Sequence, residues 1–207
     1  MFNLRINLSK AIILIFVFIG FSAQAISLID LQKQLTSQTL LQGEFTQTKN
    51  VKMFKKPLIS KGIFLLTQSQ GLMWHQQTPF PVSLILTKNK LRQQFSDKPA
   101  DIIEAKDNPM VFYFSHLFLS LFQGDIKALQ AQFNIQLISN KQGWQLDLTP
   151  KSAPLNKVFS TITIQGNQYI DSLTLSELSG DSSVIEFEKV SAIPTKLSKQ
   201  EKDAFTF

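Results

Sequence analysis

Alternation of apolar and polar residues is the feature that most limits the fold of this chain. From Leu40 onward the sequence has a period of two, and the same alternation is clear over residues 144–149. Successive side chains of a strand point to opposite faces of a sheet, so this period predicts strands with one buried face. We expect strands over residues 41–48, 60–67, 71–75, 82–87, 91–96, 133–139, 143–149, 158–165, 169–177 and 184–188. Short strands at this spacing predict an antiparallel sandwich or barrel and argue against a parallel α/β sheet.

Three segments have a helical pattern instead. Residues 27–38 place Leu28, Leu31 and Leu35 on one side of a helix. Residues 110–122 are apolar nearly all round, which is typical of a buried helix, and they are too few to cross a membrane. Asp125 can cap a third, short helix that ends near Gln132. We therefore predict a mainly-β single domain in which a buried helix lies against a strongly curved sheet.

The N-terminus predicts export. Arg5 and Lys10 precede an apolar run over residues 11–21, and Ala23 and Ala25 stand at the small-residue positions of a signal-peptidase site. An uncleaved membrane anchor is the alternative, but the run is shorter than the about 20 residues that a span needs. We expect a signal peptide over residues 1–25, one mature domain over residues 26–207 and a periplasmic location.

The composition of the chain limits how it is stabilised and which classes of partner it can bind. The chain has no Cys, so the core alone must supply its stability. The formal net charge is +6, and Arg5 and Lys10 would leave with the signal peptide. Four Lys fall within residues 49–56, a basic run suited to nucleic acid or to an anionic membrane surface. Export argues against nucleic acid, and the simpler interpretation is a solvated turn between strands.

No motif carries catalytic chemistry. His75 and His116 stand apart, without the further ligands that a zinc site needs. Ser115 lies beside His116 but outside any G-x-S-x-G elbow, so we interpret both histidines as structural. Four acids are expected to be solvated in one loop, namely Asp97, Asp101, Glu104 and Asp107. We expect no enzyme, no cofactor and no metal site.

Apolar surface is then the remaining candidate for function. The chain has 18 Phe against two Tyr and two Trp. We predict that one set of side chains lines the concave face of the sheet: Phe45, Phe64, Leu66, Leu72, Trp74, Leu84, Leu86, Leu91 and Phe95. A second set, on the helix over residues 110–122, is predicted to close that face as a lid: Phe114, Leu117, Phe118, Leu121 and Phe122.

These residues have two interpretations. An ordinary core is one, and a lipid pocket is the other, because a curved sheet closed by an apolar helix builds such a pocket. Burial of an acyl chain of roughly 14 carbons contributes about 10 kcal/mol before any cost is subtracted. Tight binding would need no polar chemistry.

Several short segments carry a further signal by their order: LQGEFTQ at residues 41–47, SKGIF at 60–64, GLMW at 71–74, TPF at 78–80 and GWQLDLTPK at 143–151, followed by the last strands of the chain. In this order they resemble the LolA family of periplasmic outer-membrane lipoprotein carriers. The resemblance implies an unclosed antiparallel β-barrel with a helical lid over a hydrophobic cavity. It also implies a monomer that takes acyl chains of lipoproteins from an inner-membrane exporter to an outer-membrane acceptor, with transient contact at the membrane surface.

The sequence departs from the family at one position. The family has an Arg that bonds to carbonyls of the lid helix and holds the cavity closed, and its place falls at Gln68 in this chain. Glutamine can still donate a hydrogen bond but lacks the charge and the fork of donors. The resemblance therefore implies a divergent member, whose cargo is a lipoprotein or another lipid, polyene or glycolipid intermediate. A lipid-sensing interaction module is the alternative from another class.

Overall fold

The computed structural model describes residues 26–108, 112, 116, 119–121, 124–140, 142–192 and 196–207. Its elements are, in chain order, α1 (Leu28–Thr36), β1 (Leu40–Asn50), β2 (Leu58–Thr67), β3 (Gly71–Thr78), β4 (Val82–Leu86), β5 (Lys90–Phe95), β6 (Asp101–Glu104), α3 (Ile126–Gln132), β7 (Phe133–Asn140), β8 (Gly143–Pro150), the 3₁₀ turn η1 (Leu155–Lys157), β9 (Phe159–Gly166), β10 (Ile170–Glu177), β11 (Ser182–Ala192) and α4 (Lys199–Ala204).

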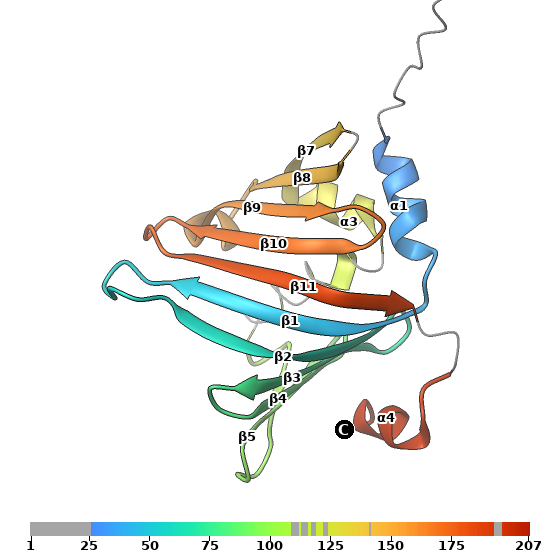
Figure 1. The fold of residues 1–207 in the computed structure, drawn as a ribbon, viewed down its shortest axis with the longest axis vertical. Coiled ribbons are helices and arrows are strands. Elements are labelled where there is room, and N and C mark those ends of the chain that lie inside the picture. Colours follow the sequence, from blue (N-terminus) through green and yellow to red (C-terminus); the bar gives the residue numbers. More distant parts are fainter. Residues whose placement is uncertain are drawn as a thin grey trace, which may run out of the picture.

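The strands form one 11-stranded antiparallel sheet that does not close (Figure 1). Their order is β6-β5-β4-β3-β2-β1-β11-β10-β9-β8-β7, so β6 and β7 are the two edges. Pairing of β1 with β11 joins the two ends of the chain at the centre of the sheet, where Phe45 faces Phe187. The predicted fold class, an unclosed antiparallel barrel in a mainly-β domain, is confirmed.

One face of the sheet, which we call the inner face, is covered by helical residues and holds the main core. Leu31 and Leu35 of α1, Leu129 of α3 and Phe112 are buried in the same apolar cluster as the inner residues of the strands. Ser27 caps α1 through a hydrogen bond from Asp30 N to its Oγ, and Asp125 caps α3 in the same way from Ala128 N. The sequence thus sets where these helices begin, and their apolar sides pack them onto the sheet.

The opposite face, the outer face, carries a second and smaller apolar cluster. Leu65, Met73 and Ile85 of three neighbouring strands are buried there against Phe205, which follows α4. α4 begins with a capping box in which Ser198 and Glu201 each bond to the other's backbone. α3 and α4 therefore lie against opposite faces of the sheet (Figure 1).

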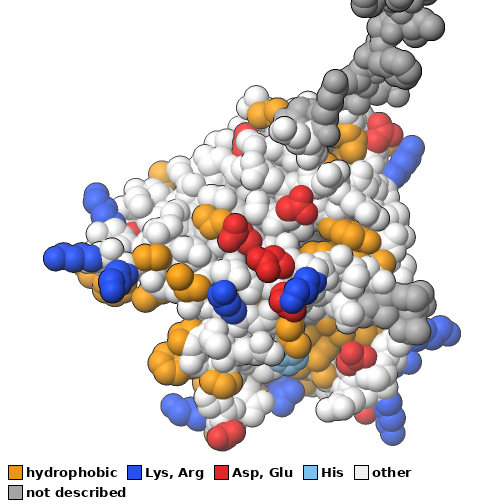
Figure 2. All heavy atoms as spheres, in the orientation of Figure 1, with side chains coloured by type: hydrophobic (Ala, Val, Ile, Leu, Met, Phe, Trp, Pro, Cys, Tyr) orange, Lys and Arg blue, Asp and Glu red, His pale blue; other side chains and the backbone are white. Residues whose placement is uncertain are grey.

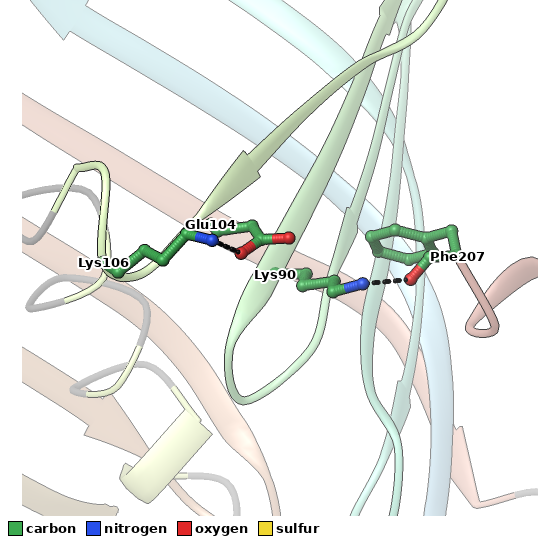
Figure 3. A network of polar contacts seen from close by, with 4 residues as sticks. All are labelled: Lys90, Glu104, Lys106 and Phe207. Atoms are coloured by element: carbon green, nitrogen blue, oxygen red, sulfur yellow. Dashed lines mark hydrogen bonds and ion pairs between the residues drawn. The ribbon is translucent and has the colours of Figure 1, made fainter.

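The charge of the C-terminal segment, residues 198–207, predicts a loosely held tail, but the structure holds this segment against the outer face. Lys90 Nζ donates to the main-chain oxygen of Phe207 at 2.8 Å, and the two residues point toward each other in Figure 3. The short apolar pattern around Phe205 and Phe207 was too weak to indicate packing on its own.

The loop predicted to hold four acids is partly a strand. Asp101 and Glu104 are the two ends of edge strand β6, which pairs with β5. Glu104 forms an ion pair with Lys106 at 2.8 Å, also drawn in Figure 3. Four residues with two acids carry little alternation, so the pairing partner, and not the local sequence, decides this strand. Among the described residues, no helix has both the length and the apolar character to cross a bilayer.

Candidate functional site: the inner face and its helical cover

All nine predicted lining residues fall on the inner face. Strand register pairs Phe64 with Trp74, Trp74 with Leu84, and Leu66 with Leu72, and directly paired residues share a face. The same register carries the face outward through Leu86, Leu91 and Phe95. The period-two pattern therefore assigned the face of each residue, while a role in binding lipid stays a prediction.

The nine predicted lining residues differ in how deeply they are buried. Six are buried in the core cluster, namely Phe45, Phe64, Leu66, Leu72, Trp74 and Leu86. Leu84 and Leu91 are partly buried against the same cluster. Phe95, at the end of β5, is 46% exposed. The inner face is thus deepest at the central strands and opens toward the β5 side.

An aromatic group lies at the centre of this face. The rings of Phe45 and Trp74 stack with their centroids 3.5 Å apart. Phe187 meets Phe64 and Trp74 edge to face, at 5.3 and 6.4 Å between centroids. Aromatic rings bury large apolar areas and have few rotamers, so these side chains make the centre of the inner face rigid.

The C-terminal strands supply the other half of the inner face, which the site predicted from the sequence does not include. Strand register continues from Phe187 through a set of buried side chains: Trp144, Leu146, Leu148, Ile162, Ile164, Leu173 and Ile185. Their alternation is as clear in the sequence as that of the first strands. The sequence does not show that β1 pairs with β11. This pairing joins the two halves into one surface.

Helix α1 covers the inner face near the β9–β10 turn. Gln34 Nε2 donates to the main-chain oxygens of Asn167, at 2.5 Å, and of Gln168, at 3.2 Å. Beneath the helix, beside Leu35, a crevice of about 10 Å³ remains. A volume of that size holds about one water molecule, so an acyl chain can enter there only if α1 moves.

The predicted lid helix is described at five of its residues. Phe112, Leu119 and Leu121 are helical and buried in the core cluster. His116 Nε2 lies 2.8 Å from the main-chain oxygen of Lys88, an acceptor, so this nitrogen carries the proton. The other predicted lid residues, Phe114, Leu117, Phe118 and Phe122, lie outside the described residues.

Gln68 connects β2 to the end of α1. Its Nε2 donates to the main-chain oxygen of Thr36, the last residue of α1, at 2.9 Å. That carbonyl has no partner within the helix, so the glutamine caps the helix C-terminus. Gly124 approaches the same turn, where a Cβ would overlap the methyl group of Thr36. Gln68 therefore bonds to a helix carbonyl, although the helix is α1 and the donor is neutral.

The described residues hold no group of three or more His, Asp or Glu that could bind a metal ion. The ring of His116 bonds to the main-chain oxygen of Lys88 and not to a carboxylate. Burial lowers the pKa of His75 below its ordinary 6.5. The lowered pKa favours a neutral imidazole at His75, which fits a structural role.

A separate hollow of about 640 Å³ lies on the outer face, next to α4. Ile63, Met73 and Ile85 are among its lining residues, and so are Glu44 and Lys189, which form an ion pair at 2.7 Å. No local sequence pattern indicates this hollow, because the C-terminal segment forms part of its wall.

Residues 36–207 match the family described as outer membrane lipoprotein carrier protein LolA. The chain belongs to the LolA family. The resemblance found in the short sequence segments is thereby confirmed, and the match begins at the last residue of α1. Members of this family are non-catalytic carriers. No curated protein matches the sequence.

The solved structures that the chain is similar to are distant in sequence. A LolA superfamily protein from Nitrosomonas europaea is 8% identical, with 85% of this chain and 97% of that one covered and a TM-score of 0.47. A putative outer membrane lipoprotein-sorting protein domain from Vibrio parahaemolyticus is 8% identical, with 88% and 98% covered and a TM-score of 0.49. Membership of the LolA family rests on the sequence match.

Proposed function

We propose that this LolA-family chain is a periplasmic carrier that holds the acyl chains of lipoproteins, or of another lipidated cargo, against its inner face. It receives the cargo at the inner membrane and passes it toward an outer-membrane acceptor. The observation that carries the proposal is the continuous apolar inner face, with Phe45, Phe64, Trp74 and Phe187 at its centre, under a helical cover.

We call α1 and the helical residues 112, 116 and 119–121 the cover of the inner face. The polar contacts described between the cover and the sheet are weak enough for a bound acyl chain to displace. Three of them join the cover to the sheet: Gln34 with Asn167, Gln68 with Thr36, and His116 with Lys88. A hydrogen bond contributes a net stabilisation of roughly 0.5–1.5 kcal/mol, so these three together contribute about 1.5–4.5 kcal/mol. Burial of an acyl chain, at about 0.8 kcal/mol per CH₂, exceeds that sum. Cargo can therefore displace the cover and replace its apolar contacts.

Native mass spectrometry of protein recovered gently from the periplasm tests this proposal. We expect acyl-chain adducts that a hydrophobic fluorophore displaces, and the adduct mass separates a lipoprotein from a free lipid or glycolipid. The intact mass also reports whether residues 1–25 have been removed. A clean mass with no uptake of added lipid or lipopeptide would mean that the inner face is only a core.

Two variants sharpen the result. Phe118→Asp, in the predicted lid segment, should abolish retention of the cargo, because a carboxylate opposes burial of the acyl chain. His116→Ala should keep cargo binding, because a carrier needs no general base. Loss of a hydrolytic activity in His116→Ala would instead favour an enzyme, and unchanged retention in Phe118→Asp would remove the lid role of that segment.

A further inference from the structure

The β1–β2 hairpin ends in an exposed tip, residues 49–61, at the far end of β1 from helix α1 (Figure 1). Four large apolar side chains of this tip face solvent: Met53 is 85% exposed, Phe54 53%, Leu58 52% and Ile59 50%. A solvated turn explains lysines, but it does not explain four exposed apolar side chains within seven residues.

Lysines surround these apolar side chains. Lys49, Lys52, Lys55, Lys56 and Lys61 all belong to the tip, and all but the first are exposed. Among the residues that the structure describes, ion pairs form only between Lys106 and Glu104 and between Lys189 and Glu44. The tip lysines therefore keep their charge unpaired. Figure 2 shows blue and orange side chains gathered at this end of the molecule.

The neighbouring β10–β11 turn holds the tip in place. Lys52 N donates to Asp181 Oδ1 at 2.9 Å, and Phe54 N donates to the main-chain oxygen of Val51 at 2.8 Å. Leu178 of the same neighbouring turn adds another exposed apolar side chain. Glu177 and Asp181 are the acids of that turn, so the five lysines outnumber them.

We propose that this tip docks the protein on an anionic lipid bilayer. The lysines would lie among headgroup phosphates, and Met53 and Phe54 would enter the interface between headgroups and acyl chains. Interleaved cations and exposed apolar side chains are the combination that binds bilayer interfaces, and each Lys adds to the attraction of an anionic surface. A protein partner would need acidic side chains and a hollow that matches the tip, whereas a bilayer needs no complementary shape.

The position of the tip suits such a contact. The ten residue steps of β1 separate it from α1 by about 30 Å at the usual rise of a strand. Docking through the tip therefore leaves the helical cover free to move. This proposal stands independently of whether the inner face binds acyl chains.

Vesicle co-sedimentation tests the proposal with exported protein. Vesicles of phosphatidylcholine mixed with an equal part of phosphatidylglycerol should bind the protein, and vesicles of phosphatidylcholine alone should bind it much less. High salt should release it, since screening weakens attraction between exposed charges. Equal binding to both kinds of vesicle, or no binding to either, would overturn the proposal.

Two tip variants and one matched control identify the surface. Lys52→Glu/Lys55→Glu/Lys56→Glu should lower partitioning to anionic vesicles by at least about tenfold. Met53→Ser/Phe54→Ser should also lower it, with charge unchanged. Lys127→Glu/Lys196→Glu/Lys199→Glu makes the same change of charge elsewhere and should lower it far less. Because all forms share one N-terminus, the differences report the tip alone.

A cargo assay keeps this proposal separate from the carrier function. The tip variants should take up a hydrophobic fluorophore as the parent does, because no tip residue lies in the inner-face cluster. Normal vesicle binding by both tip variants would overturn membrane docking. Loss of transfer from the inner membrane without any loss of vesicle binding would also overturn it, and would assign the tip to a protein partner.

Discussion

At the scale of the residue, Gln68 shows how one side chain ties the sheet to its cover. Its amide donates to Thr36 O at the C-terminus of α1, and its own backbone N donates to Thr39 O at 3.1 Å. A cation at a helix C-terminus is stabilised by the helix dipole, by about 0.3–1 kcal/mol. A neutral glutamine gives up that contribution, so this chain should hold its cover less firmly than a relative with Arg there.

Gln68→Arg is therefore expected to slow release of a bound hydrophobic fluorophore by about two- to fivefold. Gln68→Ala should speed it, because the Thr36 carbonyl loses a donor. Release rates measured by stopped-flow fluorescence check both directions. Gln77→Arg, an exposed change on β3, is the control and should leave the rate unaltered. Identical rates in all four proteins would show that Gln68 takes no part in closure.

At the scale of the element, α4 depends on its capping box more than on its length. Six residues are too few for a helix to persist alone, so the box and the packing of Phe205 must hold it. The hydrogen bond from Ser198 lowers the pKa of Glu201 below its usual 4.5. The bond thus stabilises the helix above that pH and is lost as the pH falls through the lowered pKa.

Ser198→Ala should destabilise α4 by about 1 kcal/mol, the usual effect of losing a cap. Amide hydrogen exchange in α4 should then be about fivefold faster, while exchange in β1 and β11 stays the same. Ser160→Ala, at an exposed strand position, is the matched control. Unchanged exchange in α4 would mean that Phe205 alone holds the segment on the outer face.

At the scale of the whole molecule, the cover must move relative to the sheet for cargo to enter. The chain has no Cys, so two introduced thiols can lock it selectively. Gln34 lies against Gln168 through a hydrogen bond to the latter's main-chain oxygen. Gln34→Cys/Gln168→Cys joined by a short bismaleimide should neither load nor release fluorophore.

A second cross-link supplies the control for that prediction. Gln165 and Ser172 are register partners on β9 and β10, within the sheet. Gln165→Cys/Ser172→Cys with the same reagent should load and release normally, since the sheet does not need to bend between those strands. Normal loading in the cross-linked Gln34–Gln168 form would show that α1 stays fixed while cargo enters.

Much of the fold followed from the sequence alone. Period-two alternation assigned the inner face of the predicted strands, because adjacent side chains must point to opposite faces. The spacing of Leu28, Leu31 and Leu35 indicated α1. Asp125 marked the beginning of α3, because the first amides of a helix need acceptors. Short segments in matching order indicated the LolA family, to which the chain belongs.

Tertiary structure decided what local patterns do not contain. The pairing of Phe45 with Phe187 made one surface of two halves that lie far apart in the chain. Edge strand β6 formed although its sequence alternates weakly, and the C-terminal segment packed on the outer face through Phe205. The exposure of Met53 and Phe54 is of the same kind, since side chains of these types are usually buried and the position of the hairpin leaves them in solvent. Each of these depends on contacts between distant residues, and a local period carries no information about them.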